Sequence, residues 1–331
     1  MDAPAASHLK AAVEPDAAVP GPFSSLIETA KPGITRLVTI TAAVGFGLSW
    51  ATHGHSRELG ELWLPLLSCL LGTAASAAGA NAINQFMERD RDARMQRTRR
   101  RPLPQERLAP GTVLGYGLAL SALGVAILLL GAGPVPAAIS FACIVSYTLF
   151  YTPLKPLSTL STYVGTIPGA LPPLIGWSAA AAIGHTSTAR EAGLDSLVQP
   201  GGWSLFALMT VWQLPHFFAI AWMYKDDYAR GGYKVLPVVD PTGNKTAWSI
   251  AIWTFLLIPV SLMPMWAMPE LLRWPSACVA LLGDAWFVWL AVRLIRTRSV
   301  ADARKVFFAS IAWLPAVLCA MVVEAACRVL F

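Results

Sequence analysis

Three polar side chains with the chemistry of metal ligands follow an apolar run in the first third of the chain. Asn84, Glu88 and Asp92 stand four residues apart. If the helix expected for the apolar run continues through them, all three share one face, because four residues turn a helix by only about 40° beyond a full circle. Amide and carboxylate oxygens suit a hard cation such as Mg²⁺. The spacing therefore predicts a magnesium site where this helix ends.

Arginines follow this acidic face directly, at residues 97, 99, 100 and 101. Arginine binds phosphate through a planar fork of N–H donors. A simpler explanation is that Arg97 and Arg101 only hold the loop on the cytoplasmic side of a membrane. That explanation leaves Glu88 and Asp92 without a role, because orientation needs no acidic residue. Acids and bases together at a membrane surface favour a metal-bound polyphosphate over a contact with another protein.

A second polar cluster begins at Lys225 and continues with Asp226 and Asp227. Adjacent residues of a helix point about 100° apart, so one aspartate could bind a metal while the other pairs with Lys225 or Arg230. A plain charged loop is the alternative. Lys155, between two prolines, is by itself an anchoring charge at the end of an apolar segment.

Two ionisable residues lie inside apolar segments, where such groups are candidates for function. His216 follows Pro215, and its imidazole could be a ligand or could simply bond to a carbonyl freed by the proline. Asp284 could pair with Arg293 or line a cavity. Asp90 points about 160° away from Glu88 on a helix, so we expect it to be a solvated partner of an arginine.

The composition is that of a polytopic membrane protein. The 331 residues are 55% hydrophobic and 13% charged, whereas soluble domains are about 25% charged. The net charge of +6 does not indicate a nucleic-acid partner, because the basic residues lie between apolar segments, where topology explains them. The five cysteines stand singly in apolar runs, so neither a disulfide framework nor a zinc site is expected.

Nine apolar segments are long enough to cross a bilayer, which takes about 20 helical residues. We expect an all-α protein with one transmembrane domain over residues 31–331. Residues 1–30 are rich in Ala and Pro and lack the pattern of a signal peptide, so they are expected to form a disordered cytoplasmic tail. The segments run over 34–52, 62–87, 112–131, 135–152, 160–183, 203–224, 246–268, 275–296 and 306–328.

The distribution of basic residues predicts the orientation. With the N-terminus in the cytoplasm, 21 of the 25 Lys and Arg residues fall on the cytoplasmic side, and only Arg57, Arg190, Arg273 and Arg328 fall outside. This asymmetry predicts a cytoplasmic N-terminus and an external C-terminus. The polar loops after the second, fourth and sixth segments then share the cytoplasmic face, where they can converge on one mouth.

The segment from Asn84 to Pro104 resembles the first signature of the UbiA-type intramembrane prenyltransferases. Other stretches resemble the branch of that family whose members farnesylate haem, and the resemblance spans about residues 25–328. These stretches are Lys31–Thr35, Tyr151–Lys155, Ile167–Trp177, Trp212–Phe217, Asp226–Tyr228 and Gly231–Gly232.

The resemblance implies nine transmembrane helices around a central cavity, capped by cytoplasmic loops. It also implies Mg²⁺-dependent transfer of a farnesyl group from farnesyl diphosphate to a vinyl group of haem B, with addition of water, to give haem O for terminal oxidases. The chain departs from the broader family pattern, since Gln85 and Glu88 stand where that pattern has aspartates. Fewer carboxylates leave the number of Mg²⁺ ions open.

On this basis each candidate residue receives a role. The expected metal ligands, counted among the catalytic residues, are Asn84, Glu88, Asp92, Asp226 and Asp227. The expected diphosphate contacts are Arg97, Arg101, Lys155 and Lys225. The ring of Tyr151 would face the allylic carbocation. His216 would touch haem, either as an iron ligand or as a partner of a propionate.

Two rival functions are open at this point. One is a UbiA-type enzyme with another acceptor, such as 4-hydroxybenzoate or a chlorophyll precursor. The other is a membrane transporter or lipid-binding scaffold without chemistry, since broken helices and buried acids occur in transporters. The charges lie at one membrane face rather than at the midplane, which disfavours the transporter. Whether haem A synthase or an oxidase assembly factor docks on the protein is also open.

Overall fold

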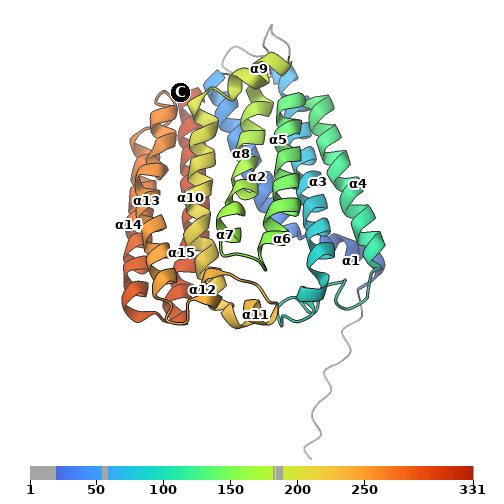
Figure 1. Ribbon diagram of the computed structural model, residues 1–331. Coiled ribbons are helices and arrows are strands. Elements are labelled where there is room, and N and C mark those ends of the chain that lie inside the picture. The colour runs from blue at the N-terminus through green and yellow to red at the C-terminus, as the bar shows by residue number, and fades with distance from the viewer. Residues whose placement is uncertain (1–19, 54–58, 182, 184–188, 331) are drawn as a thin grey trace, which may run out of the picture.

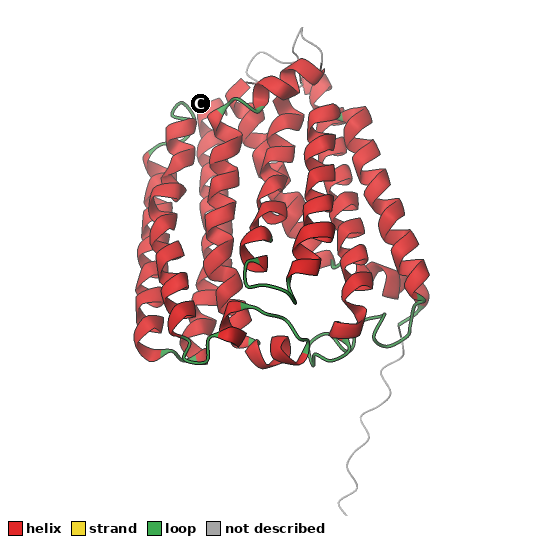
Figure 2. Ribbon diagram, in the orientation of Figure 1, coloured by secondary structure: helices red, strands yellow, loops and turns green. Residues whose placement is uncertain are grey.

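The computed structural model describes residues 20–53, 59–181, 183 and 189–330, and in these ranges it contains helices and no strand (Figure 2). Long helices stand side by side, and short helices and loops cover the two ends of the bundle (Figure 1). The long helices are α2 (Pro32–His53), α3 (Leu59–Asp92), α4 (Pro110–Gly131), α5 (Pro134–Val145), α8 (Thr166–Ala181), α10 (Pro200–Met223), α13 (Asn244–Ala267), α14 (Trp274–Thr297) and α15 (Val300–Leu330).

The shorter elements lie near the ends of the bundle. At the end that carries α11, the chain also places α1 and α12, and at the opposite end lies α9 (Figure 1). Helix α5 continues through one π-helical stretch, η1, into α6, and α7 leads into α8. These elements are α1 (Pro22–Thr29), η1 (Ser146–Tyr151), α6 (Thr152–Leu154), α7 (Ser161–Val164), α9 (Ala189–Ser196), α11 (Lys225–Arg230) and α12 (Leu236–Val239).

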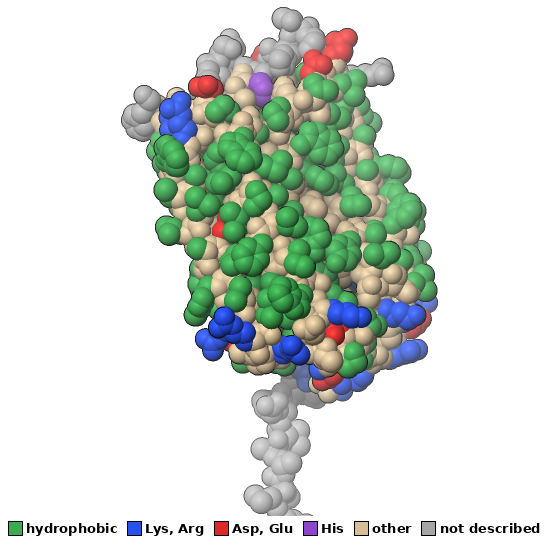
Figure 3. All heavy atoms as spheres, turned by 60° about the vertical axis from the view of Figure 1, so that its left-hand side comes forward, with side chains coloured by type: hydrophobic (Ala, Val, Ile, Leu, Met, Phe, Trp, Pro, Cys, Tyr) green, Lys and Arg blue, Asp and Glu red, His purple; other side chains and the backbone are tan. Residues whose placement is uncertain are grey.

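The described helices fit a membrane. Eight of them are long and apolar enough to cross a bilayer, and hydrophobic side chains cover the middle of the surface in Figure 3, with Lys and Arg gathered at the lower end. The predicted fifth segment is instead divided between α7 and the 16-residue α8, which contains Pro172 and Pro173. The polytopic all-α fold is therefore confirmed, while the count of nine crossings stays a prediction at that segment.

Part of the segment expected to be a disordered tail is helical. Residues 1–19 lie outside the described residues, but Pro22–Thr29 form α1, in which Ser25 and Thr29 are buried. Glu28 of this helix forms an ion pair with Arg107, at 2.7 Å. The tail prediction is therefore wrong for residues 22–29. The Ala/Pro-rich composition gives no sign of the short amphipathic helix at residues 22–29. Such a short helix is stable only when it packs against other elements, here α3 and α4.

Small residues let the central helices approach each other closely. A Cβ on Gly176 of α8 would come within 1.8 Å of the Ala42 carbonyl oxygen of α2, and a Cβ on Gly45 within 2.0 Å of the Pro173 carbonyl oxygen. Membrane helices associate through such close backbone packing, because lipid supplies no hydrophobic driving force between helices. This packing fixes α2 and α8 against each other.

The buried acid of α14 has a local partner. Asp284 accepts a hydrogen bond from the Ser261 hydroxyl, at 2.7 Å, whereas Arg293 forms an ion pair with Asp302, at 3.1 Å. Pairing of Asp284 with Arg293 is therefore wrong. Asp90 behaves as expected, since its exposed side chain lies 3.6 Å from Arg89.

Candidate active site

The last turns of α3 carry the predicted acidic face. Helix α3 continues to Asp92, so Asn84, Glu88 and Asp92 do share one side of it. Their exposed fractions are 0%, 6% and 1%. Polar groups buried this deeply in an apolar bundle need partners, because an unpaired charge there is strongly unfavourable.

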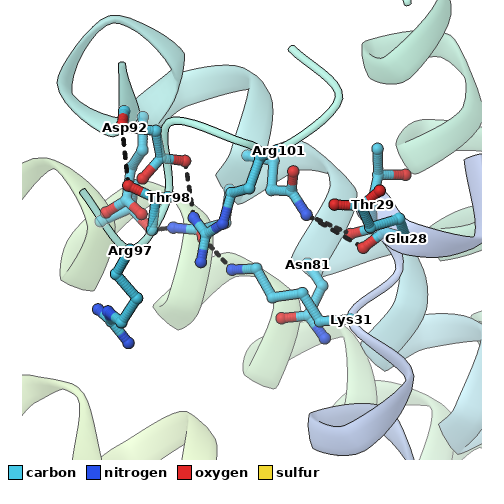
Figure 4. A network of polar contacts seen from close by, with 12 residues as sticks. Glu28, Thr29, Lys31, Asn81, Asp92, Arg97, Thr98 and Arg101 are labelled. Atoms are coloured by element: carbon cyan, nitrogen blue, oxygen red, sulfur yellow. Dashed lines mark hydrogen bonds and ion pairs between the residues drawn. The ribbon is translucent and has the colours of Figure 1, made fainter. Parts of the chain in front are cut away.

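Each of these three side chains is matched by one cation from another part of the chain. Lys155 Nζ lies 2.8 Å from Glu88 Oε1, and Arg101 Nη1 lies 2.7 Å from Asp92 Oδ2. Lys31 Nζ donates to Asn84 Oδ1 at 2.6 Å. Figure 4 shows Arg101 reaching back to Asp92, while Arg97 points away from this ion pair. Three cations and two carboxylates thus form one buried cluster, which we call the inner cluster.

The inner cluster retains one unmatched acceptor. Asp92 Oδ1 is buried and has no hydrogen-bond partner among the described residues. The main chain around it is fixed, because the Thr98 hydroxyl donates to the Asp92 carbonyl oxygen at 2.9 Å. A carboxylate oxygen without a donor is a position that a cation or a water would fill.

Aromatic rings border the inner cluster on the side of η1. Lys155 Nζ lies 4.4 Å from the centre of the Tyr151 ring, and the rings of Tyr147 and Tyr151 lie 5.5 Å apart. The π-helical turn between these tyrosines sets their spacing, as such turns often do at functional sites. Burial alone would lower the pKa of Lys155, but the neighbouring carboxylate of Glu88 holds that pKa well above its usual value.

Lys31 is a functional candidate that sequence reasoning missed. Burial, and to a smaller extent the charge of Arg101, lowers the pKa of its ammonium group to about 7. The residue has a left-handed backbone, with φ of 47°, in the short link between α1 and α2. In the sequence Lys31 looked like a charge flanking a membrane segment, and only its place in the Lys31–Thr35 resemblance could have suggested more.

Asp227 is bound by protein donors, which include Arg230, one of the two partners that the sequence offered for an aspartate of this cluster. Its Oδ1 accepts from the Gln96 N–H at 2.9 Å, and its Oδ2 accepts from the Arg97 N–H at 3.1 Å. Arg230 also forms an ion pair with it. Burial is the largest single influence and by itself would raise the pKa of Asp227. The hydrogen bonds from Gln96, Arg230 and Arg97 together outweigh it, so the pKa of Asp227 is lowered. Asp227 therefore holds the loop after α3 against α11.

Further bonds join the loops at this end of the bundle. Arg91 Nη1 donates to the Gly231 carbonyl oxygen at 3.0 Å, and the Lys234 N–H donates to the Lys155 carbonyl oxygen at 2.9 Å. The predicted convergence of the loops after the second, fourth and sixth segments is confirmed by these contacts.

The remaining loop candidates lie around an outer cavity of 570 Å³, which Glu88 and Asp92 do not line. Arg97 lies over the rings of Tyr224 and Tyr228, at 5.1 and 5.7 Å. Asp226 is exposed at the rim of this cavity, and Lys225 is exposed beside it. The structure thus divides the predicted site into an inner cluster on α3 and an outer cavity on α11.

No metal centre is fully assembled in the described residues, since no three His, Cys, Asp or Glu side chains there converge on one point. The donor chemistry nevertheless fits Mg²⁺. Glu88 and Asp92 offer hard oxygen ligands at one face, and Asp92 Oδ1 lacks a partner among the described residues. The assignment of Asn84, Asp226 and Asp227 to the metal stays a prediction.

The structure thus defines a membrane-embedded helical bundle with a buried cluster of cations and carboxylates at one end, and comparison with known proteins identifies its family. Residues 38–313 match the UbiA prenyltransferase family, and the chain belongs to that family. The expected family membership and transferase class are confirmed.

Individual proteins of known name or structure are similar to this chain. The chain is 41% identical over 304 residues to the protoheme IX farnesyltransferase of Solibacter usitatus (strain Ellin6076), covering 90% of this chain and 97% of that relative. A solved structure described as digeranylgeranylglyceryl phosphate synthase has a TM-score of 0.70 at 15% identity, covering 92% of this chain and 98% of that one. A UbiA homolog from Archaeoglobus fulgidus bound to GPP and Mg²⁺ has a TM-score of 0.57 at 13% identity, covering 90% and 99%. At these identities the two structures show a shared fold.

Proposed function

We propose that the protein transfers a farnesyl group from farnesyl diphosphate to a vinyl group of haem B, with addition of water, to give haem O and diphosphate. The observation that carries this proposal is the inner cluster, in which Lys31, Arg101 and Lys155 surround two buried carboxylates. The name of the similar protoheme IX farnesyltransferase supports haem as the acceptor.

The cations of the inner cluster would bind the diphosphate. Breaking the allylic carbon–oxygen bond places negative charge on the leaving group, and positively charged donors held in a low-dielectric site stabilise that charge strongly. Lys31, Arg101 and Lys155 are already held close together, so little reorganisation is needed. Arg97 and Lys225, from the outer cavity and its surroundings, would hold the distal phosphate.

Mg²⁺ held by Glu88 and Asp92, with Asn84, would supply further positive charge to the leaving group, and the predicted ligands Asp226 and Asp227 would hold a second ion from the outer cavity. The UbiA homolog from Archaeoglobus fulgidus, whose structure holds GPP together with Mg²⁺, supports this choice of ion.

The apolar bundle would hold the farnesyl chain, which enters from the bilayer, and would exclude water from the allylic carbon. The rings of Tyr151 and Tyr147 would stabilise the allylic cation through their π faces. The terminal vinyl carbon of haem forms a new bond to carbon 1 of the farnesyl group as the bond to diphosphate breaks. Water then adds to the inner vinyl carbon and loses a proton.

The finer location follows from charge. We place the N-terminus and the inner cluster on the cytoplasmic side of a bacterial inner membrane, with the C-terminus outside, because 21 of the 25 Lys and Arg residues then face the cytoplasm. Residues 31–331 would form one transmembrane prenyltransferase domain. Haem A synthase or an oxidase assembly factor is the kind of partner that would receive the product.

A transfer assay tests the proposal. Purified protein in lipid nanodiscs is incubated with Mg²⁺, labelled farnesyl diphosphate and haem B, 4-hydroxybenzoate or a chlorophyll precursor, and the products are separated by reverse-phase chromatography. The expected result is that the wild-type protein labels haem. Asp92→Ala protein should still insert into the membrane but should not label haem. Label on another acceptor but not on haem would contradict the acceptor. No Mg²⁺-dependent diphosphate release with any acceptor would leave the transporter or scaffold as the function.

A further inference from the structure

Two aromatic rings stack close to the imidazole ring of His216 in α10. The Trp212 ring lies 5.2 Å away at an angle of 21°, and the Phe307 ring of α15 lies 5.1 Å away at 29°. At one edge, His216 Nδ1 lies 2.8 Å from the Ser310 hydroxyl oxygen. The side chain is nevertheless only half-buried. Nε2, at the opposite edge of the ring, makes no hydrogen bond with the described residues.

The hydrogen bonds of Ser310 determine which ring nitrogen carries the proton. The Ser310 hydroxyl lies 2.6 Å from the Phe307 carbonyl oxygen, a separation that two oxygens adopt only with a proton between them. A carbonyl cannot donate, so the single proton of the hydroxyl points to Phe307. The hydroxyl oxygen must then accept from His216, and the N–H of the imidazole is at Nδ1.

This proton arrangement leaves Nε2 with a lone pair. No acidic side chain forms an ion pair with His216 among the described residues, so a protonated ring would be an unpaired charge inside the bundle, which is unfavourable. A neutral ring with its proton on Nδ1 cannot donate from Nε2 to a carboxylate. It can bind a metal ion through Nε2, and metal-binding histidines commonly donate their other N–H to a fixed acceptor.

We propose that Ser310 is a positioning residue that fixes the tautomer of His216, so that Nε2 binds the iron of the porphyrin acceptor. The proposal rests on the farnesyl-transfer function above and decides between the two haem contacts left open by the sequence, iron rather than propionate. His216 precedes the end of α10 at Met223 by seven residues, or roughly 10 Å along the helix. That depth places the acceptor on the bilayer side of the diphosphate site.

Haem binding without farnesyl diphosphate tests this role directly. Haem B is titrated into the full-length protein in nanodiscs, and absorption and resonance Raman spectra are recorded for wild type, Ser310→Ala, Ser310→Thr and His216→Ala. Wild type is expected to show a nitrogen ligand on the iron, and His216→Ala to lose it. Ser310→Ala should weaken haem binding about 10-fold and lower the ferrous iron–imidazole stretching frequency, since the imidazole loses the acceptor that makes it more basic.

The control variants separate positioning from folding. Ser310→Thr keeps a hydroxyl that can bond to the same carbonyl, so its stretching frequency should return close to that of wild type, and farnesyl diphosphate binding should be unchanged in all three variants. A Ser310→Ala frequency and affinity equal to wild type, or an equal loss of both substrates, would overturn the role of Ser310. A His216→Ala spectrum identical to wild type would overturn iron ligation. Farnesylated haem formed by wild type in those cases would leave the proposed function intact.

Discussion

The ion pair between Lys155 and Glu88 makes the most specific prediction about the inner cluster. Lys155→Met removes the cation and keeps most of the volume of the side chain. The two side chains are 15% and 7% exposed and their charges are 2.8 Å apart, so solvent screens them weakly. Removing one partner of such a pair leaves an uncompensated buried charge, which typically costs about 3–5 kcal/mol.

The neighbouring cation sets where in that range the cost falls. The charge of Lys31 also acts on Glu88. The pKa of Lys31 is lowered to about 7, so part of that charge remains near neutral pH and offsets part of the loss of Lys155. We expect Lys155→Met to lower the free energy of unfolding by about 3 kcal/mol, at the lower end of the range for a broken buried pair. Adding Glu88→Gln removes the stranded charge, so the double variant should recover most of that loss. The coupling free energy should be about 2 kcal/mol, within the range of residues in contact.

The same variant should impair catalysis, because Lys155 is assigned to the diphosphate. A charge-assisted hydrogen bond contributes about 1.5–3 kcal/mol, which corresponds to a fall of about 10- to 150-fold in kcat/KM. The double variant should regain stability but not activity. This difference separates the structural role of the pair from its role in binding.

Two measurements check these values. Unfolding in mixed micelles, followed by tryptophan fluorescence, gives the stability of the wild type, both single variants and the double variant. Transfer of labelled farnesyl gives kcat/KM. Lys245→Met is the matched control, because Lys245 is exposed and such substitutions usually change stability by less than about 0.5 kcal/mol. If Lys155→Met and the double variant unfold at the same free energy, the ion pair does not stabilise the site and the reasoning is refuted.

Two further predictions concern other parts of the site. Asp227→Asn should cost about 1–3 kcal/mol locally, because an amide cannot accept from Gln96, Arg97 and Arg230 together, and hydrogen exchange of residues 94–100 should increase. If Asp227 also binds the metal as proposed, the response to Mg²⁺ should weaken in the same variant, and an unchanged response would exclude that role. The pKa of Lys31 is about 7 in the free protein, so this amine is mostly neutral at pH 8. If a bound diphosphate restores its charge, the protein should take up close to one proton per diphosphate bound at pH 8. Calorimetry in buffers of different ionisation enthalpy measures this uptake. The uptake should fall as the pH drops below 7 and vanish in Lys31→Met, and an unchanged uptake in that variant would exclude Lys31 as its source.

The positions that the sequence predicted best depend on one helix. Asn84, Glu88 and Asp92 could be placed on one face because the helical period is fixed and needs no tertiary information. The proline-rich fifth segment was harder, since prolines interrupt a helix at positions that depend on its neighbours. The helix over residues 22–29 was missed for a related reason, because a short helix is stable only against the rest of the protein.

The partners of the site residues could not be predicted in the same way. Lys31 meets Asn84 across 53 positions of the chain, and nothing in the sequence near either residue indicates that contact. Asp227 accepts hydrogen bonds from two backbone N–H groups. Every residue except proline has such a group, so the type of the donor residue cannot predict the contact. The residue type of Asp227 therefore suggested a metal ligand or a partner of Lys225 or Arg230, and not the backbone contacts that both of its oxygens make.

The charge balance of the inner cluster also bears on how many metal ions the proposed reaction would need. Three cations, Lys31, Arg101 and Lys155, face two carboxylates, so the fully ionised cluster carries one positive charge in excess. An ionised diphosphate ester carries roughly three negative charges, so the complex with a single Mg²⁺ has one negative charge and neutralises the cluster. Because an uncompensated charge in a buried site is unfavourable, this balance favours one Mg²⁺ in the inner cluster, and a second ion would need the exposed carboxylate of Asp226.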